Sequence, residues 1–258
     1  MKRLSLLICA LTMALATHSQ NNLKLMNYNI RNATGTDNIL DVGRIASIIA
    51  HEKPDVVAVQ EIDSMTTRSK QQYILGEIAK RTQMHATYAP AIDFQGGKYG
   101  VGILSRKKPI AIEQHPLPGR EERRTLLIVE FKRYIFCCTH FSLTEEDQMA
   151  SVDIIKQVAT GRHKPLFLAG DLNASPDSKV ITSLAEDFIL LNDPATHTFP
   201  AHKPSVTIDY IAAWKHGDRH LTNIEPQVIE EPIASDHRPL TVKLSIKKAK
   251  KRRNFPIP

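Results

Sequence analysis

The stretch Pro54-Asp55-Val56-Val57-Ala58-Val59-Gln60-Glu61 holds an apolar run that ends in a carboxylate. Residues 56–62 predict a buried strand, since the run is short, apolar and rich in valine. The proline before it fits a turn from a preceding helix. Strand alternation puts Val57, Val59 and Glu61 on one face. We therefore expect Glu61 to emerge where the strand leaves the core.

Three further predicted strands end in the same way, with a polar side chain in line with apolar neighbours. On one strand face, Asn29 follows Leu23 and Leu25. On two other strands, His140 follows Phe136 and Cys138, and Asp171 follows Phe167 and Ala169. A single polar strand end is commonly a cap or a satisfied core group. Four of them, together with Asn173, Asp209, Asp236 and His237, indicate a functional site in the loops at the strand ends.

Helical spacing of apolar residues predicts helices over residues 39–51, 71–82 and 145–160. Other strands are predicted at 100–104, 125–132, 134–140, 166–169, 208–212 and 240–246. Some neighbouring strands have no helix between them. This order predicts an α/β fold with mixed sheets packed face to face and helices outside. No Pro/Gly/Ser-rich linker divides the body, so we expect one domain over residues 21–246.

The residue types at the strand ends suit one kind of chemistry. Glu61, Asp171 and Asp236 offer hard oxygen ligands, which Mg²⁺ and Mn²⁺ prefer. His140 and His237 are able to donate to a phosphoryl oxygen or to move a proton near neutral pH. The sequence holds no Gly-rich phosphate loop and no Gly-x-Ser-x-Gly elbow. Water is therefore the expected nucleophile.

The chain resembles the endonuclease/exonuclease/phosphatase superfamily of metal-dependent phosphoesterases. The resemblance spans residues 24 to about 240 and rests on short motifs in the family's order. The motifs are Met26-Asn27-Tyr28-Asn29-Ile30-Arg31, Pro54 to Glu61, Tyr99-Gly100, Glu122 with Arg124, Thr139-His140-Phe141, Gly170-Asp171-Leu172-Asn173-Ala174, Ile208-Asp209-Tyr210-Ile211 and Ser235-Asp236-His237. It implies a four-layer α/β/β/α sandwich with two packed mixed β-sheets and a site at one end.

The resemblance also implies a role for each matching residue. Metal binding falls to Glu61, with Asn29 beside it and Asp236 completing the site. His237 is the general base or a phosphate contact, and Asp209 orients it. The remaining implied roles are Asp171 positioning the water, Asn173 and His140 stabilising phosphoryl charge, and Tyr99 and Arg124 contacting the substrate.

Both ends of the chain differ from the body. Lys2 and Arg3 precede an apolar stretch of about 13 residues, which predicts a signal peptide over residues 1–20 and an exported, periplasmic or extracellular protein. An uncleaved anchor is the alternative. The net charge is +7, but residues 247–258 form a basic tail and leave the body near neutral. That tail is either a solvated end or a segment that binds nucleic acid.

The shared motifs do not select a substrate. The pattern around Thr198-Phe199-Pro200 and Ile208-Asp209 looks like secreted bacterial members of unassigned substrate. We expect hydrolysis of a phosphomonoester or phosphodiester by a monomer. The alternatives are a secreted nuclease acting on DNA or RNA and, in a different class, an inactive binding module. No later segment is apolar for long enough to span a membrane. Cys137 and Cys138 are expected on opposite faces of one strand, as buried thiols.

Overall fold

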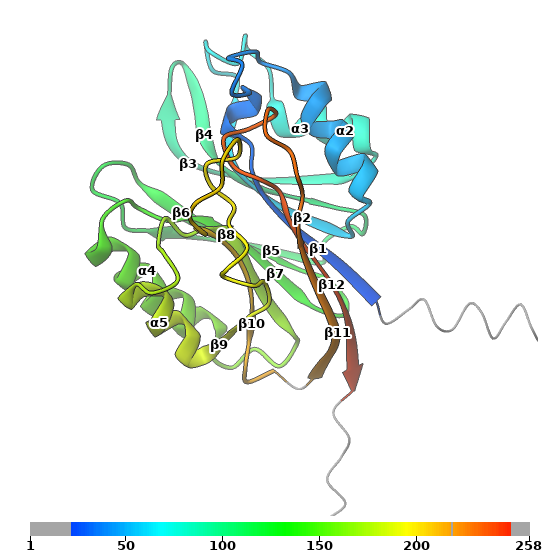
Figure 1. Ribbon diagram of the computed structural model, residues 1–258, viewed down its shortest axis with the longest axis vertical. Helices are drawn as coiled ribbons and strands as arrows, with labels where there is room; N and C mark the ends of the chain where they lie inside the picture. Colours follow the sequence, from blue (N-terminus) through cyan, green and yellow to red (C-terminus); the bar gives the residue numbers. More distant parts are fainter. Residues whose placement is uncertain (1–21, 218, 249–258) are drawn as a thin grey trace, which may run out of the picture.

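A computed structural model describes residues 22–217 and 219–248 (Figure 1). The predicted signal peptide and residues 249–258 of the predicted tail lie outside the described residues. Two six-stranded sheets form the centre. The first has the order β11 (Arg219–Val228), β12 (Leu240–Lys248), β1 (Asn22–Asn29), β2 (Val56–Ser64), β4 (Gly97–Ser105), β3 (His85–Phe94). The second has the order β5 (Ala111–Leu117), β6 (Arg124–Glu130), β7 (Ile135–His140), β8 (Leu166–Asp171), β10 (Asp209–Trp214), β9 (Phe188–Leu190).

Each sheet is mixed, as predicted. Strand β1 runs parallel to β2 and antiparallel to β12, and β7 runs parallel to β8 whereas β6 and β7 are antiparallel. The helices flank the sheets on their outer faces (Figure 1). Helices α2 (Val42–Glu52) and α3 (Ile74–Thr82) cover the first sheet, and α4 (Glu145–Ala159) and α5 (Lys179–Asp187) cover the second.

Three apolar clusters hold these layers together. Leu25 and Ala58 of the first sheet meet Phe136 and Phe167 of the second in the central cluster. Separate clusters lie under each helical pair. Cys138 belongs to the central cluster and Cys137 to the cluster under α4 and α5, so the two thiols point to opposite faces. The four-layer α/β/β/α prediction is confirmed.

Local signals set the helix boundaries. The carboxylate of Asp41 accepts a hydrogen bond from the backbone N–H of Arg44 and caps the start of α2. Lys53 ends the same helix in a left-handed conformation, with φ of 51°. Among the described residues, no helix is both long and apolar enough to cross a bilayer.

Several elements of the fold were not predicted from the sequence. The missed strands are β3, β5, β9 and β11, which are the four outermost strands of the two sheets. Three of them carry a proline and exposed polar side chains, as edge strands often do, and these weaken the apolar pattern that identifies a strand. Helix α5 was also missed.

Candidate active site

Strand direction brings the predicted site residues to one end of the sandwich. Asn29, His140 and Asp171 are the last residues of β1, β7 and β8. Asp209 starts β10 and pairs directly with Asp171, since these strands are antiparallel. His237 lies in the loop before β12, which runs antiparallel to β1.

Glu61 reaches this end by a route that strand alternation does not predict. Val57 and Val59 face α2 and α3, away from Leu25 and the second sheet. Between Val59 and Ile62 the pairing of β2 with β4 shifts, and Glu61 takes a left-handed conformation with φ of 58°. A β-bulge of this kind re-aims a side chain. The prediction that Glu61 shares the face of the two valines is therefore wrong.

Asn29 connects the two sheets. Its Nδ2 donates to Oε1 of Glu61 and to Oδ2 of Asp171, both at 3.0 Å. Its Oδ1 accepts a hydrogen bond from the backbone N–H of Arg31 at 3.1 Å, which fixes the orientation of the amide. Asn29 is fully buried, so these contacts hold the two carboxylates at a defined separation.

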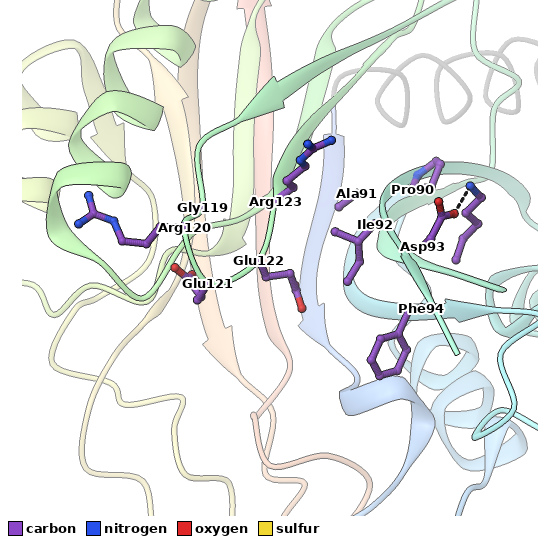
Figure 2. A pocket seen from close by; sticks show the side chains of 11 residues that line it. Pro90, Ala91, Ile92, Asp93, Phe94, Gly119, Arg120, Glu121, Glu122 and Arg123 are labelled. Atoms are coloured by element: carbon purple, nitrogen blue, oxygen red, sulfur yellow. Dashed lines mark hydrogen bonds and ion pairs between the residues drawn. The ribbon is translucent and has the colours of Figure 1, made fainter. Parts of the chain in front are cut away.

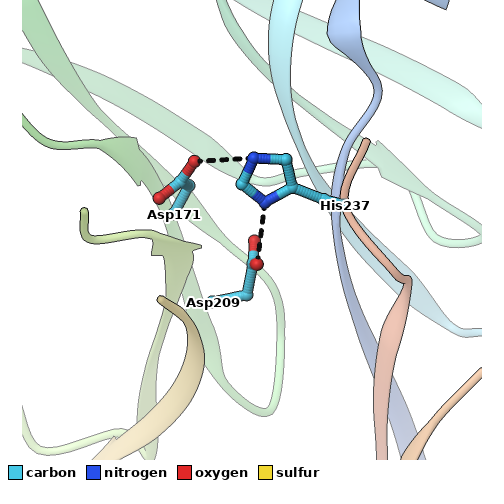
Figure 3. Close-up of side chains that lie close together, drawn as sticks. All are labelled: Asp171, Asp209 and His237. Atoms are coloured by element: carbon cyan, nitrogen blue, oxygen red, sulfur yellow. Dashed lines mark hydrogen bonds and ion pairs between the residues drawn. The ribbon is translucent and has the colours of Figure 1, made fainter. Parts of the chain in front are cut away.

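His237 lies between two carboxylates (Figure 3). Its Nδ1 donates to Oδ2 of Asp209 at 2.9 Å, and its Nε2 lies 3.5 Å from Oδ2 of Asp171. Burial by itself lowers the pKa of His237, but the charges of Asp209, Asp171 and Asp236 outweigh it and raise that pKa to about 10. In the absence of a cation, His237 is therefore protonated on both ring nitrogens and positively charged at neutral pH.

His140 has the opposite protonation state to His237, although it also lies close to Asp171. Its Nε2 lies 3.5 Å from Oδ2 of Asp171. Burial lowers the pKa of His140 to about 4, and the positive charges of Arg124 and His237 add to that effect. His140 is therefore neutral at pH 7 and suits a hydrogen-bond donor to a phosphoryl oxygen.

The other predicted residues surround this centre. Asn173 donates through its backbone N–H to Oδ1 of Asp171 at 3.0 Å and through Nδ2 to the carbonyl of Phe141 at 3.1 Å. Tyr99 and Arg124 line one small pocket together with His140. All three side chains are at least nine-tenths buried.

Asp236 lies at the rim, half-exposed and 3.8 Å from Nε of Arg31. Burial is the main cause that raises the pKa of Glu61, the hydrogen bond from Asn29 opposes it, and the charges of Asp236 and Asp171 raise it further. The carboxylates of Glu61, Asp171 and Asp236 lie near one another, and such a set of oxygen donors fits a hard divalent cation. The carboxylates that would hold it are those of Glu61 and Asp236, with Asn29 beside them.

Asp171, Asp209 and His237 also bring three potential ligand atoms within 4.8 Å of one another. However, both carboxylate oxygens of Asp209 are already hydrogen-bonded, Oδ2 to His237 and Oδ1 to Asn27 Nδ2 at 3.2 Å. This pairing fits an oriented imidazole better than a metal site.

Asn27 and Gln60 belong to the hydrogen-bond network of the site, although no role was predicted for either residue from the sequence. Gln60 Nε2 donates to Oδ1 of Asn27 at 2.9 Å, and Asn27 in turn donates to Asp209. Both side chains are fully buried between the sheets. Period-two alternation from Leu25 through Asn27 to Asn29 is the signal that would have placed Asn27 on this face.

Arg68 was missed as well. Its guanidinium lies 4.5 Å from the ring centroid of Phe94 and 5.4 Å from that of Tyr99, and it pairs with the buried carboxylate of Asp63 at 2.6 Å. It therefore makes a cation–π contact with the ring of Tyr99. No sequence motif pointed to this contact, because it joins a loop to a strand.

Comparison with known proteins identifies a family whose model covers most of the chain. The model of the Endonuclease/Exonuclease/phosphatase family matches residues 26–237. No curated protein sequence matches the chain. A family protein from Beutenbergia cavernae superposes with a TM-score of 0.72 at 21% identity, covering 88% of this chain and 72% of that one.

Two other similar structures belong to proteins with more specific names. The mannosyl-6-phosphatase Bt3783 of Bacteroides thetaiotaomicron has a TM-score of 0.65 at 17% identity, covering 86% of this chain and 99% of that one. The human Nocturnin catalytic domain with bound sulfate has a TM-score of 0.63 at 17% identity, covering 88% and 95%. At these identities the likeness is one of fold.

Proposed function

Since the chain belongs to the endonuclease/exonuclease/phosphatase family, we propose that it hydrolyses a phosphomonoester or phosphodiester with Mg²⁺ or Mn²⁺ and an attacking water. Members of this family are hydrolases of phosphoester bonds and generally use divalent metals. The observation that carries the proposal is the position of His237 between Asp209 and Asp171, with Asp171 joined through Asn29 to Glu61.

A divalent cation held by Glu61 and Asp236, beside Asn29, would neutralise charge on the phosphoryl oxygens. His237 takes a proton from the attacking water after its Nε2 has released its own proton to solvent. A bound cation would favour that release, because it would offset the charges of Asp171 and Asp236, which add to that of Asp209 in raising the pKa of His237. Asp209 keeps Nδ1 protonated and leaves Nε2 to face Asp171, where the water is positioned.

The neutral donors complete the site. His140 and Asn173 lie beside Asp171 and stabilise negative charge that develops on the phosphoryl group. Arg124 supports the same function, since it lines the same pocket as His140 and its buried Nε has no hydrogen-bond partner among the described residues. A phosphoryl oxygen would satisfy this donor.

A metal-exchange assay tests the proposal. The protein is treated exhaustively with EDTA, then assayed with Mg²⁺ or Mn²⁺ against an aryl phosphomonoester, an aryl phosphodiester, plasmid DNA, sphingomyelin and inositol phosphates. We expect turnover of at least one substrate, its loss on chelation and its recovery with either ion. Full activity after chelation, or no hydrolysis of any phosphate ester, contradicts the proposal.

The cellular location is a second proposal and rests on the sequence of residues 1–20 alone. We infer that the chain is exported and that the signal is cleaved. Cell fractionation followed by mass spectrometry of the mature N-terminus tests it. Recovery of the uncleaved chain from the cytosol contradicts it.

A further inference from the structure

An open groove lies beside the candidate active site, between the β3–β4 hairpin and the loop before β6 (Figure 2). One wall is the β3–β4 hairpin, including Ile92 and Phe94, and the other is the loop of residues 119–123. We call this feature the hairpin groove. Its volume of about 790 Å³ is within the range of small-molecule sites.

The hairpin groove lies beside the catalytic centre. It shares Ala91 and Glu122 with the small pocket that Tyr99, Arg124 and His140 line. A phosphoryl group held at His140 would therefore have the hairpin groove beside it as space for the rest of the substrate. Arg124, which lines that small pocket, is 8% exposed, and its Nε has no partner among the described residues.

The cations that line the hairpin groove differ in their partners. Arg120 is held by Asp147 of α4 at 3.2 Å and points away from the hairpin (Figure 2). Lys98 pairs with Asp93 on the hairpin itself. Arg123 is exposed, and within the described part of the chain it has neither a hydrogen bond nor an ion pair.

The carboxylates on the wall formed by residues 119–123 already have hydrogen-bond or ion-pair partners. Glu121 accepts hydrogen bonds from Arg124 at 3.3 Å and from the backbone N–H of Leu143 at 2.8 Å. Glu122 pairs with Nη1 of Arg124 at 3.0 Å. These contacts leave Arg123 as the charge on this wall that is available to a ligand, and a guanidinium suits phosphate or carboxylate.

We propose that the hairpin groove binds the leaving group of the substrate and that Arg123 pairs with a second anionic group on it. The substrate is then a phosphate ester that carries at least two anionic groups. Ile92 and Phe94 supply the apolar wall along which the body of the leaving group lies. This inference rests on the phosphoesterase function proposed above.

The test compares fructose 1,6-bisphosphate with fructose 6-phosphate, which differ by one phosphate. Binding is measured by calorimetry in EDTA, so that the result does not depend on turnover. Wild-type protein should bind the bisphosphate more tightly. Arg123→Gln should lower the ratio of the two affinities about fivefold, which is the upper range for an exposed ion pair, and 0.5 M salt should shrink this difference.

Lys108→Gln is the matched control, since it removes one exposed positive charge from the β4–β5 connection, at the opposite end of β4 from the hairpin turn. It should leave the affinity ratio unchanged. An unchanged ratio in Arg123→Gln, equal loss in both variants, or no binding of either sugar phosphate by the wild type overturns the inference.

Hydrolysis separates this inference from the proposed function. If the aryl esters are hydrolysed with metal but Arg123→Gln leaves the ratio unchanged, the hairpin groove assignment fails and the phosphoesterase function stands. If the ratio falls as expected but no phosphate ester is hydrolysed, the groove binds anionic compounds and the phosphoesterase function fails.

Discussion

Nδ1 of His237 lies 2.9 Å from Oδ2 of Asp209, and the two residues come from different sheets. His237 precedes β12 of the first sheet and Asp209 begins β10 of the second. The correct packing of the sheets is therefore a condition for the pair to form. Asp209 is held on its other oxygen by Asn27, so the carboxylate that orients the imidazole is itself fixed.

Loss of this pair should reduce catalysis more than stability. His237→Ala should lower kcat by about 10²–10⁴-fold, which is the typical contribution of a general base. Asp209→Asn should cause a smaller loss, because the imidazole remains but its tautomer is no longer fixed. Steady-state kinetics and melting temperature are measured on both variants. A folded His237→Ala enzyme with nearly normal kcat would show that His237 moves no proton.

The raised pKa of His237 predicts how stability depends on pH in metal-free protein. The pKa in the folded state, about 10, lies above the usual value of about 6.5, so protonation of His237 favours the fold. That contribution is complete below about pH 6.5 and is lost as the pH rises toward 10. Melting temperature in EDTA should fall over this window.

His237→Gln should make this fall shallower, since the variant lacks the titrating group. His216→Gln is the control, because His216 is exposed and pairs with Asp187 far from the site. It should keep the wild-type slope. Equal slopes in wild type and His237→Gln would contradict the prediction.

Glu61 is expected to dominate metal affinity. Glu61→Gln preserves the shape of the side chain at the bulge but removes one of the charges that attract the cation. Calorimetry should show Mg²⁺ or Mn²⁺ binding weakened by at least tenfold. Glu52→Gln removes the same charge from an ion pair with Lys24 at the other end of β1 and should bind metal as the wild type does. Equal affinities in the two variants would argue against Glu61 as a ligand.

Asn27 should act through Asp209. Asn27→Leu keeps a similar volume but removes the donor to Asp209 and the acceptor for Gln60. Unfolding free energy should drop by about 1–3 kcal/mol, the usual cost of buried polar groups left unpaired. kcat should also fall by about tenfold with KM nearly unchanged.

Ser151→Ala provides a comparison for this effect. The Ser151 hydroxyl bonds to the Asp147 carbonyl within α4, remote from Asp209, so its loss should alter stability alone. If Asn27→Leu and Ser151→Ala both leave kcat unchanged, Asn27 has only a structural role.

The central strands could be predicted from the sequence because burial on both faces leaves an apolar run. β2, β7 and β8 are examples, and each was expected from its own residues. The edge strands lacked this signal. β3 and β11 each carry one proline and exposed polar residues. Their pairing with β4 and β12 decides that they are strands.

Within the site, the sequence by itself determined which residue types stand at the strand ends, because period-two alternation and the ordered motifs are local. It indicated Asn29, His140 and Asp171 on this basis. Only the tertiary structure decided that Glu61 turns toward Asn29, since a register shift against β4 creates the bulge. It also decided that Asn27 reaches Asp209, 182 positions later in the chain, because packing of two sheets is a long-range outcome that no local pattern encodes.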